Sequence, residues 1–217
     1  MLTIYGVYRS RAARNIWLAN ELGVPFKHVP VIQVNRLPNP NAADAPLHTK
    51  SPAFLKVNPN GHVPCIDDNG LVLCESMAIN LYLARKHGGP LAPANIAEEG
   101  LMTQWSFWAA CEMDPLVIQS LYNRVMKPEA ERDLKAAEMA EAALKVPLKV
   151  LNRYVGASDY LVGGRFTVAD LNVSEVVRTM TVSAPQLLDD VPNVKAWLAT
   201  CHARPHFKAM MEIRNAE

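Results

Sequence analysis

Residues 58 to 83 of this chain are Asn58-Pro-Asn-Gly-His-Val-Pro-Cys-Ile-Asp-Asp-Asn-Gly-Leu-Val-Leu-Cys-Glu-Ser-Met-Ala-Ile-Asn-Leu-Tyr-Leu83. Two turns are expected in this stretch, at 58–61 and 68–70, because Pro presets φ and because Asn and Gly tolerate positive φ. Two short strands, 62–67 and 71–74, are therefore predicted, joined by a hairpin turn whose Asn-Gly pair suits type I′. A helix is predicted to follow.

Pro64 and Ser76 give this stretch its expected chemistry. Pro64 cannot donate to a strand ladder, so it belongs at an edge or an irregular point of the sheet. Ser76 can cap the helix that Glu75-Ser76 opens, and the free N–H groups at that terminus favour an anion. An edge strand beside a helix N-terminus predicts a surface that binds a short peptide carrying a carboxylate.

The motif Asn-Pro-x-Gly-x-Val-Pro, followed by a hairpin and by Glu-Ser at a helix start, resembles the glutathione-binding half of the glutathione S-transferase family. The resemblance is closest to serine-type (theta-, delta- and phi-like) bacterial members. It implies that Pro64 follows a cis peptide bond and shapes the site. Taken singly, Pro64 could simply end a strand and Ser76 could simply cap a helix; the order and spacing of all the pieces favour the family.

Composition limits the classes of function. The chain has 217 residues with a net charge of +1, which gives no bulk attraction to nucleic acid or to a membrane surface. No apolar run approaches the length of a membrane span, and the N-terminus lacks a signal-peptide pattern. The four cysteines form no C-x-x-C pair and no zinc spacing, so we expect free thiols, no metal and a cytoplasmic protein.

The N-terminal part predicts an α/β domain. A strand at 2–7, a helix at 12–22 and a strand at 26–32 make a βαβ unit with parallel strands. An irregular, proline-containing connection at 34–50 follows, either a lid or a tolerated insertion, and then a short helical turn at 51–56. With the two strands and the helix after residue 58, the order is βαβ-α-ββα. This is the order of a thioredoxin-like domain covering residues 1–86.

The remainder predicts an all-α domain at 95–217 after a Gly- and Pro-containing linker at 87–94. Asn95-x-x-Glu98 and Thr167-x-x-Asp170 match capping boxes. Pro115 is expected to kink one helix and Pro147 to bend or break another, which we expect to start at Pro128. A helix at 191–203 and a short tail helix complete the domain.

The candidate reactive centre is the start of the first helix, Tyr8-Arg-Ser10-Arg-Ala-Ala-Arg14. It has no cysteine, so dithiol–disulfide exchange is excluded at this position. In the serine-type relatives a serine four residues before an arginine donates a hydrogen bond to the glutathione sulfur, which implies that role for Ser10. Tyr8 has the spacing of the catalytic tyrosine of tyrosine-type relatives and stays an alternative. The Glu75-Ser76 pair favours Ser10, although Ser10 could also be a plain helix cap.

The resemblance implies further roles for individual residues. Val63 would pair its backbone with the cysteinyl unit of glutathione, while Ser76 and Glu75 would bind the γ-glutamyl carboxylate and ammonium. His62 and Lys50 would lie near the glycyl carboxylate. An electrophile pocket is expected between the domains, and its candidate residues are Trp105, Trp108, Cys111 and Glu112. The alternative is that these residues are core or dimer contacts.

Two classes of function follow. The first is a glutathione transferase that uses glutathione as co-substrate, attacks a hydrophobic electrophile for detoxification and forms a homodimer. The second is a non-catalytic protein of the same fold that binds glutathione or hydrophobic ligands. Within the enzyme class, peroxidase, isomerase and dehalogenase activities stay open, because they share the thiol site and differ in the second pocket.

Overall fold

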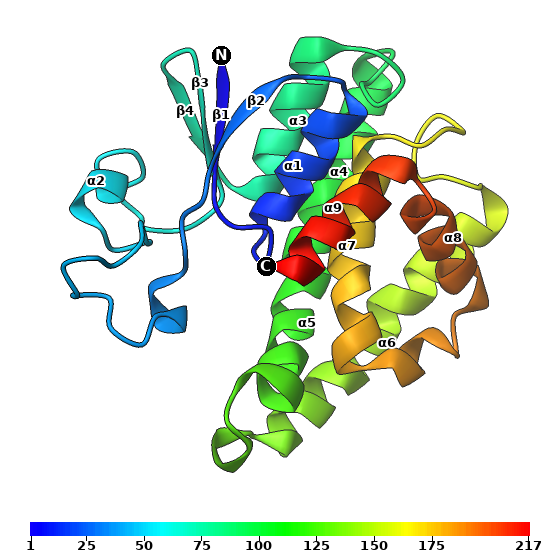
Figure 1. Cartoon of the computed structure of the whole chain (residues 1–217). Coiled ribbons are helices and arrows are strands. Elements are labelled where there is room, and N and C mark those ends of the chain that lie inside the picture. The colour runs from blue at the N-terminus through cyan, green and yellow to red at the C-terminus, as the bar shows by residue number, and fades with distance from the viewer. The chain divides into compact units, whose positions relative to one another are not determined.

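The computed structural model describes all residues, 1–217, and divides into two compact units (Figure 1). Unit 1 comprises Met1–Gly89 and Pro205–Glu217, and unit 2 comprises Pro90–Arg204. The elements of unit 1 are β1 (Leu2–Tyr5), α1 (Ala12–Glu21), β2 (Phe26–Val29), α2 (Pro52–Leu55), β3 (Cys65–Asp68), β4 (Leu71–Cys74), α3 (Ser76–His87) and α9 (Pro205–Ala216). This order confirms the predicted thioredoxin-like βαβ-α-ββα arrangement.

The sheet of unit 1 has the order β2-β1-β3-β4. β1 pairs in parallel with β2, as the βαβ prediction required, and antiparallel with β3, which pairs antiparallel with β4. Alternate side chains face opposite sides of the sheet. Ile4 and Ile66 are cross-strand neighbours and fully buried, whereas Phe54 of α2 packs with Cys65.

The first strand after the turn is shorter than predicted. Residues 62–64 form no strand, and β3 begins at Cys65. The side-chain amide of Asn58 donates to the carbonyl of His62 at 2.8 Å, and Pro64 has no N–H to donate. These two constraints hold the segment as a loop.

The last helix belongs to unit 1, whereas the sequence prediction placed residues 205–217 in the helical domain. α9 packs against α1, where the Phe207 ring meets Trp17 edge-on with a centroid distance of 4.9 Å. Both aromatic side chains are buried. An amphipathic helix predicts that a partner exists but not which one, so the sequence pattern left this packing open.

Unit 2 is helical, as predicted. Its helices are α4 (Ile96–Trp108), α5 (Asp114–Leu121), α6 (Leu134–Ala157), α7 (Val168–Ser183) and α8 (Pro192–His202). α7 is the most buried of them and carries the predicted capping box at Thr167 and Asp170. No helix of either unit is both long and apolar enough to span a bilayer.

The prolines of unit 2 act differently from one another. A π-helical segment, Ala109–Met113, separates α4 from α5 just before Pro115, which confirms the predicted irregularity. At Pro147, where a bend or a break was expected, the helix does not break, since α6 continues through this residue. The expected start at Pro128 is wrong: α6 starts at Leu134, where the Asp133 side chain accepts a hydrogen bond from the Ala136 N–H at 2.9 Å.

The start of α4 is tied to the loop before α7 by an ion pair. The Asn95 side chain caps α4 by accepting from the Glu98 N–H, and Glu98 bonds Arg165 through both carboxylate oxygens, at 3.0 and 2.6 Å. The Arg165 guanidinium, followed by the Ala94 N–H, lowers the pKa of Glu98 to about 2. Arg165 also donates to the carbonyls of Pro90 and Ala92, so one side chain joins three segments.

This pair predicts a pH dependence of stability. The folded pKa of Glu98 lies below its ordinary value of 4.5, so the stabilisation is complete above that value and is lost as the pH falls toward 2. In Arg165→Gln the free energy of unfolding, measured by urea titration at several pH values, should fall less steeply between about pH 4.5 and 2. Lys195→Gln, at the exposed Asp189 ion pair, is the control and should leave that slope unchanged. An unaltered slope in Arg165→Gln would contradict the assignment.

Candidate functional site

The loop between β1 and α1 holds Ser10 at the start of the helix. The Ser10 hydroxyl donates to the Val7 carbonyl at 2.7 Å and accepts from the Ala12 N–H at 3.1 Å. The second contact satisfies one of the free N–H groups of the first turn, as a helix cap does. Rotation of the hydroxyl away from Val7 would free its proton for another acceptor while the oxygen stays in place.

The surroundings of Gly6 show which residues lie near the Ser10 hydroxyl. Its φ is +132°, and a Cβ added there would lie 2.7 Å from the Ala12 Cβ, 3.2 Å from the Val63 Cβ and 3.4 Å from the Ser10 Oγ. Only glycine fits this position, both for its backbone and for its surroundings. Ser10 and Val63 therefore border the same small space at the N-terminus of α1.

The loop before β3 supplies the other side of that space. The Val63–Pro64 peptide bond is cis, as the resemblance implied. Val63 is half-buried and Pro64 buried, and their loop is tied down by the bond from Asn58 to His62. Pro64 leads directly into Cys65, which pairs with Tyr5 of β1. Ser10 and the Val63–Pro64 segment thus sit at the ends of neighbouring strands.

Glu75 and Ser76 occupy the start of α3. Glu75 is exposed and has a φ of +68°, an unusual backbone conformation for a residue other than glycine, and such outliers gather at functional sites. Ser76 is the first helical residue rather than the predicted cap, a place that Glu75 takes. The Ser76 hydroxyl instead accepts from the buried Arg14 guanidinium at 3.1 Å.

Arg14 and Asn15 are residues whose part in this site the sequence analysis missed. Arg14 holds the Ser76 hydroxyl, and the Asn15 side-chain amide donates to the Ser76 carbonyl at 2.8 Å and to Asn80 at 2.7 Å. These bonds join α1 to the start of α3 across more than 60 residues of sequence. A buried cation beside a helix N-terminus makes this corner favourable for a carboxylate.

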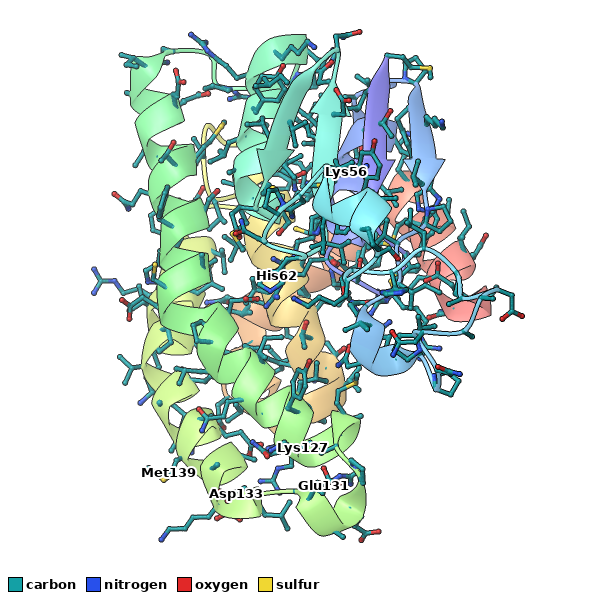
Figure 2. All side chains as sticks on the ribbon, turned by 90° about the vertical axis from the view of Figure 1, so that its left-hand side faces the viewer. Lys56, His62, Lys127, Glu131, Asp133 and Met139 are labelled. Atoms are coloured by element: carbon teal, nitrogen blue, oxygen red, sulfur yellow. The ribbon has the colours of Figure 1, made fainter.

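Lys50 and His62 are the candidates for the glycyl carboxylate. A Cβ on Gly61 would lie 3.4 Å from the Lys50 Nζ, so the ammonium group lies next to the residue before His62. Both side chains are exposed, and His62 lies in the loop between α2 and β3 (Figure 2). The arrangement brings together two of the residues predicted to meet a carboxylate.

Tyr8 points to a different neighbour. Its ring meets the His28 ring of β2 edge-on, with a centroid distance of 5.1 Å, and β2 flanks β1 on the side opposite β3. Burial, and then the Glu217 carboxylate, raise the pKa of Tyr8 above its ordinary value. A raised pKa makes the phenol a weaker hydrogen-bond donor to a thiolate. Geometry and electrostatics both favour Ser10 over Tyr8.

The four candidates for the electrophile pocket lie in unit 2. Trp105 is buried and meets Trp108 and Tyr154 edge-on, with centroid distances of 5.0 and 4.8 Å. It is therefore a core residue of its unit. Cys111 and Glu112 are exposed in the π-helical segment, and Trp108 is half-buried. These three have surface available for a ligand.

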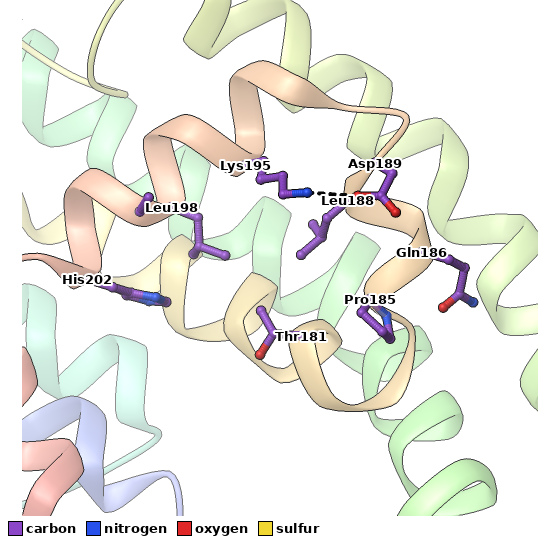
Figure 3. Close-up of a pocket in the computed structure, with 9 residues that line it drawn as sticks. Thr181, Pro185, Gln186, Leu188, Asp189, Lys195, Leu198 and His202 are labelled. Atoms are coloured by element: carbon purple, nitrogen blue, oxygen red, sulfur yellow. Dashed lines mark hydrogen bonds and ion pairs between the residues drawn. The ribbon is translucent and has the colours of Figure 1, made fainter.

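A shallow pocket of about 550 Å³ also lies in unit 2, beside α7 and α8 (Figure 3). Leu188 and Leu198 contribute apolar surface, and the Lys195–Asp189 ion pair lies at its edge. None of the residues predicted from sequence lines it. All the residues that line it belong to unit 2, whereas the residues around Ser10 belong to unit 1.

Two family models match the chain. The glutathione S-transferase N-terminal domain matches residues 9–86, and the glutathione S-transferase C-terminal domain matches residues 113–205. The first match contains Ser10, the Val63–Pro64 segment and the Glu75–Ser76 pair.

Individual relatives agree with the models. A glutathione S-transferase from Hyoscyamus muticus is 32% identical over 93% of this chain and 92% of its own length. Glutathione S-transferase F13 from Arabidopsis thaliana is 34% identical over 74% of this chain and 76% of its own. A theta class glutathione S-transferase from Xanthomonas axonopodis pv. citri, solved with glutathione bound, is 28% identical, with a TM-score of 0.81 and coverage of 96% of this chain and 95% of that one.

Proposed function

This chain belongs to the glutathione S-transferase family, and we propose that it joins the sulfur of glutathione to an electrophilic small molecule with Ser10 as the thiol-activating residue. The observation that carries the proposal is the position of the Ser10 hydroxyl. It lies at the N-terminus of α1 and borders, together with Val63, the small space next to Gly6.

The chemistry needs a thiolate. A cysteine thiol has a pKa near 8.5 and is mostly protonated at neutral pH, whereas the thiolate is the nucleophile. A hydroxyl donor and the N-terminus of a helix both favour the anion and lower that pKa. The thiolate then attacks the electrophilic carbon, and a carbon–sulfur bond forms. In a substitution, the leaving group departs with its bonding electrons. In an addition to a double bond, the electron pair of that bond moves to the other end of the substrate.

The rest of the glutathione molecule is assigned by charge. We place its γ-glutamyl end at Glu75 and Ser76, because a carboxylate suits the Ser76 hydroxyl and the nearby Arg14 cation, and an ammonium suits Glu75. The cysteinyl unit lies along Val63 and Pro64. The glycyl carboxylate lies at Lys50 and His62, which are exposed side chains beside Gly61.

The electrophile is the part of the substrate that the family leaves open. We assign its binding to Trp108, Cys111 and Glu112, because these side chains have exposed surface, and we assign Trp105 a supporting role beneath Trp108. A hydrophobic electrophile is the class that an indole ring favours. Conjugation of such compounds serves detoxification.

The test is the ionisation of glutathione bound to the purified protein, followed by thiolate absorbance over a pH titration in wild type and Ser10→Ala. A bound thiol with a pKa well below 8.5 that returns toward this value in the variant supports the proposal. Glutathione that binds with an unshifted thiol supports the non-catalytic binding protein instead, and conjugation of an activated aryl halide then stays at the uncatalysed rate. A shift that survives in Ser10→Ala but is lost in Tyr8→Phe would assign the role to Tyr8.

We also propose that the protein is a homodimer. Large apolar side chains are exposed along α6, with Met139 65% exposed, Val146 69% and Val150 51% (Figure 2). Exposed apolar surface of this kind marks association sites. Sedimentation velocity should give twice the 24.0 kDa of the chain, and Val146→Glu should shift the protein toward the single-chain mass. A single-chain mass for the wild-type protein at micromolar concentration would contradict the dimer.

A cytoplasmic location is inferred from the cysteines. All four are free thiols, and Cys65 and Cys201 are buried. Burial raises the pKa of Cys65 to about 12, so this thiol is unreactive although it follows Pro64 directly. The set suits a reducing compartment, where thiols persist.

A further inference from the structure

The loop that carries Ser10 takes several of its hydrogen bonds from segments other than β1 and α1, which flank it. The Gly6 carbonyl bonds the His28 ring, and the Val7 carbonyl accepts from Ser10. The N–H groups of the next two residues, Tyr8 and Arg9, bond partners elsewhere in the chain. The partners come from the end of unit 1, more than 200 residues later in sequence.

Glu217 bonds the loop through both of its carboxylate oxygens. One oxygen accepts from the Tyr8 N–H at 3.1 Å and the other from the Arg9 N–H at 2.6 Å. Hydrogen bonds to an ionised acceptor are stronger than those between neutral groups. Two consecutive N–H groups held by one carboxylate fix the orientation of both peptide planes before Ser10.

Arg214 bonds the same loop through its carbonyl side. Its guanidinium donates to the Tyr8 carbonyl. Arg214 and Glu217 are three residues apart. Glu217 directly follows α9, and its N–H donates to the Ile213 carbonyl at 3.1 Å, so it continues the helical spacing by one residue and lies on the same side as Arg214. α9 is itself fixed on α1 by Phe207 and by the buried Met210.

We propose that Glu217 and Arg214 are positioning residues for the reaction, which hold the Tyr8–Arg9 peptides so that the Ser10 hydroxyl reaches the glutathione sulfur. The inference rests on the proposed function of Ser10. The Tyr8–Arg9 peptide that both residues hold lies one residue before Ser10, so a rotation of this peptide moves the Ser10 backbone and displaces its hydroxyl. Displacement of a catalytic group by about 1 Å can lower the rate about 100-fold. Loss of the hydrogen bonds from one of these two residues should therefore lower the rate by a smaller factor.

The first test compares Glu217→Ala with Glu212→Ala, an exposed glutamate on the same helix. Glu217→Ala should lower kcat about 10-fold. The dissociation constant of glutathione and the melting temperature should stay at the values of the Glu212→Ala control. Hydrogen exchange of the Tyr8 and Arg9 amides should accelerate in Glu217→Ala only. An equal melting-temperature loss and an unchanged kcat would assign Glu217 a merely structural role and overturn the inference.

The second test asks whether Glu217 acts through Ser10. If it does, the double variant Ser10→Ala/Glu217→Ala should be no slower than Ser10→Ala alone. Additive losses would overturn the positioning role. If Ser10→Ala lowers kcat and Glu217→Ala does not, the inference fails and the proposed function stands. If Ser10→Ala changes neither kcat nor the thiol pKa, the proposed function fails, and the positioning role fails with it.

Arg214→Gln provides an independent variant that leaves the carboxylate in place. It removes the charged donor to the Tyr8 carbonyl and should lower kcat in the same direction, again with glutathione affinity near that of wild type. Full activity in both Arg214→Gln and Glu217→Ala would show that the loop needs neither contact.

Discussion

Below about pH 6, Ser10→Ala should lower the rate of conjugation about 100-fold while leaving most of the affinity for glutathione. The reason is ionisation of the thiol. A thiolate held at a helix N-terminus by a hydroxyl donor titrates with a pKa of about 6.5, whereas the free thiol titrates near 8.5. Below the lower value, the thiolate fraction and the rate therefore differ by about 100-fold between wild type and variant.

The profile of rate against pH separates ionisation from other causes. In Ser10→Ala the rate should keep rising up to about pH 8.5, so the deficit shrinks as the pH rises. A constant deficit at all pH values would mean that the variant loses positioning rather than ionisation. Tyr8→Phe is the matched control. It should change the rate less than Ser10→Ala, because Tyr8 packs against His28 and burial raises its pKa.

Asp170→Ala should lower the free energy of unfolding by about 3–5 kcal/mol. Asp170 is fully buried at the start of α7. Its carboxylate accepts from the N–H groups of Leu161 and Thr167, each at 2.9 Å, and from the Trp197 indole at 3.0 Å. The substitution leaves these buried donors without an acceptor, and each carries a desolvation cost of about 1–3 kcal/mol.

Urea unfolding measures this loss, and two further variants show its cause. Asp170→Asn keeps one carbonyl oxygen and should lose less than Asp170→Ala. Asp189→Ala removes an exposed ion pair with Lys195 and should cost less than about 1 kcal/mol. Burial raises the pKa of Asp170, and the donated hydrogen bonds oppose that shift. A loss in Asp170→Ala no larger than in Asp189→Ala would show that the network does not support the fold.

Local sequence signals predicted the local structure well. The hairpin at Asn69-Gly70, the parallel βαβ unit and the capping box at Thr167 depend on residues close in sequence or on a strong backbone preference, and the structure confirms them. Two of the wrong expectations concern prolines. Pro147 lies within α6 without ending it, because the packing of its neighbours overrides the local preference.

Contacts between distant segments were less predictable. The sequence predicted Ser76 as a helix cap, whereas Glu75 takes that position, and it did not predict the bond from Arg14 to Ser76, which joins residues 62 positions apart. Nor did the sequence predict that α9 packs against α1, since the apolar face of a helix does not specify which element it packs against. The candidate site residues came from the family motif, whereas the hydrogen bonds that support them join segments distant in sequence and are seen only in the folded structure.

The return of α9 to unit 1 has a consequence for synthesis on the ribosome. Unit 1 starts at the first residue but is complete only after residues 205–217 have been made, and all of unit 2 is made in between. During that interval Trp17 lacks its Phe207 neighbour, and the Tyr8–Arg9 peptides lack their carboxylate. Domains commonly fold in order as they are synthesised. Here the unit that is begun first is finished last, so the nascent chain acquires the completed Ser10 loop only when translation has passed the entire helical unit.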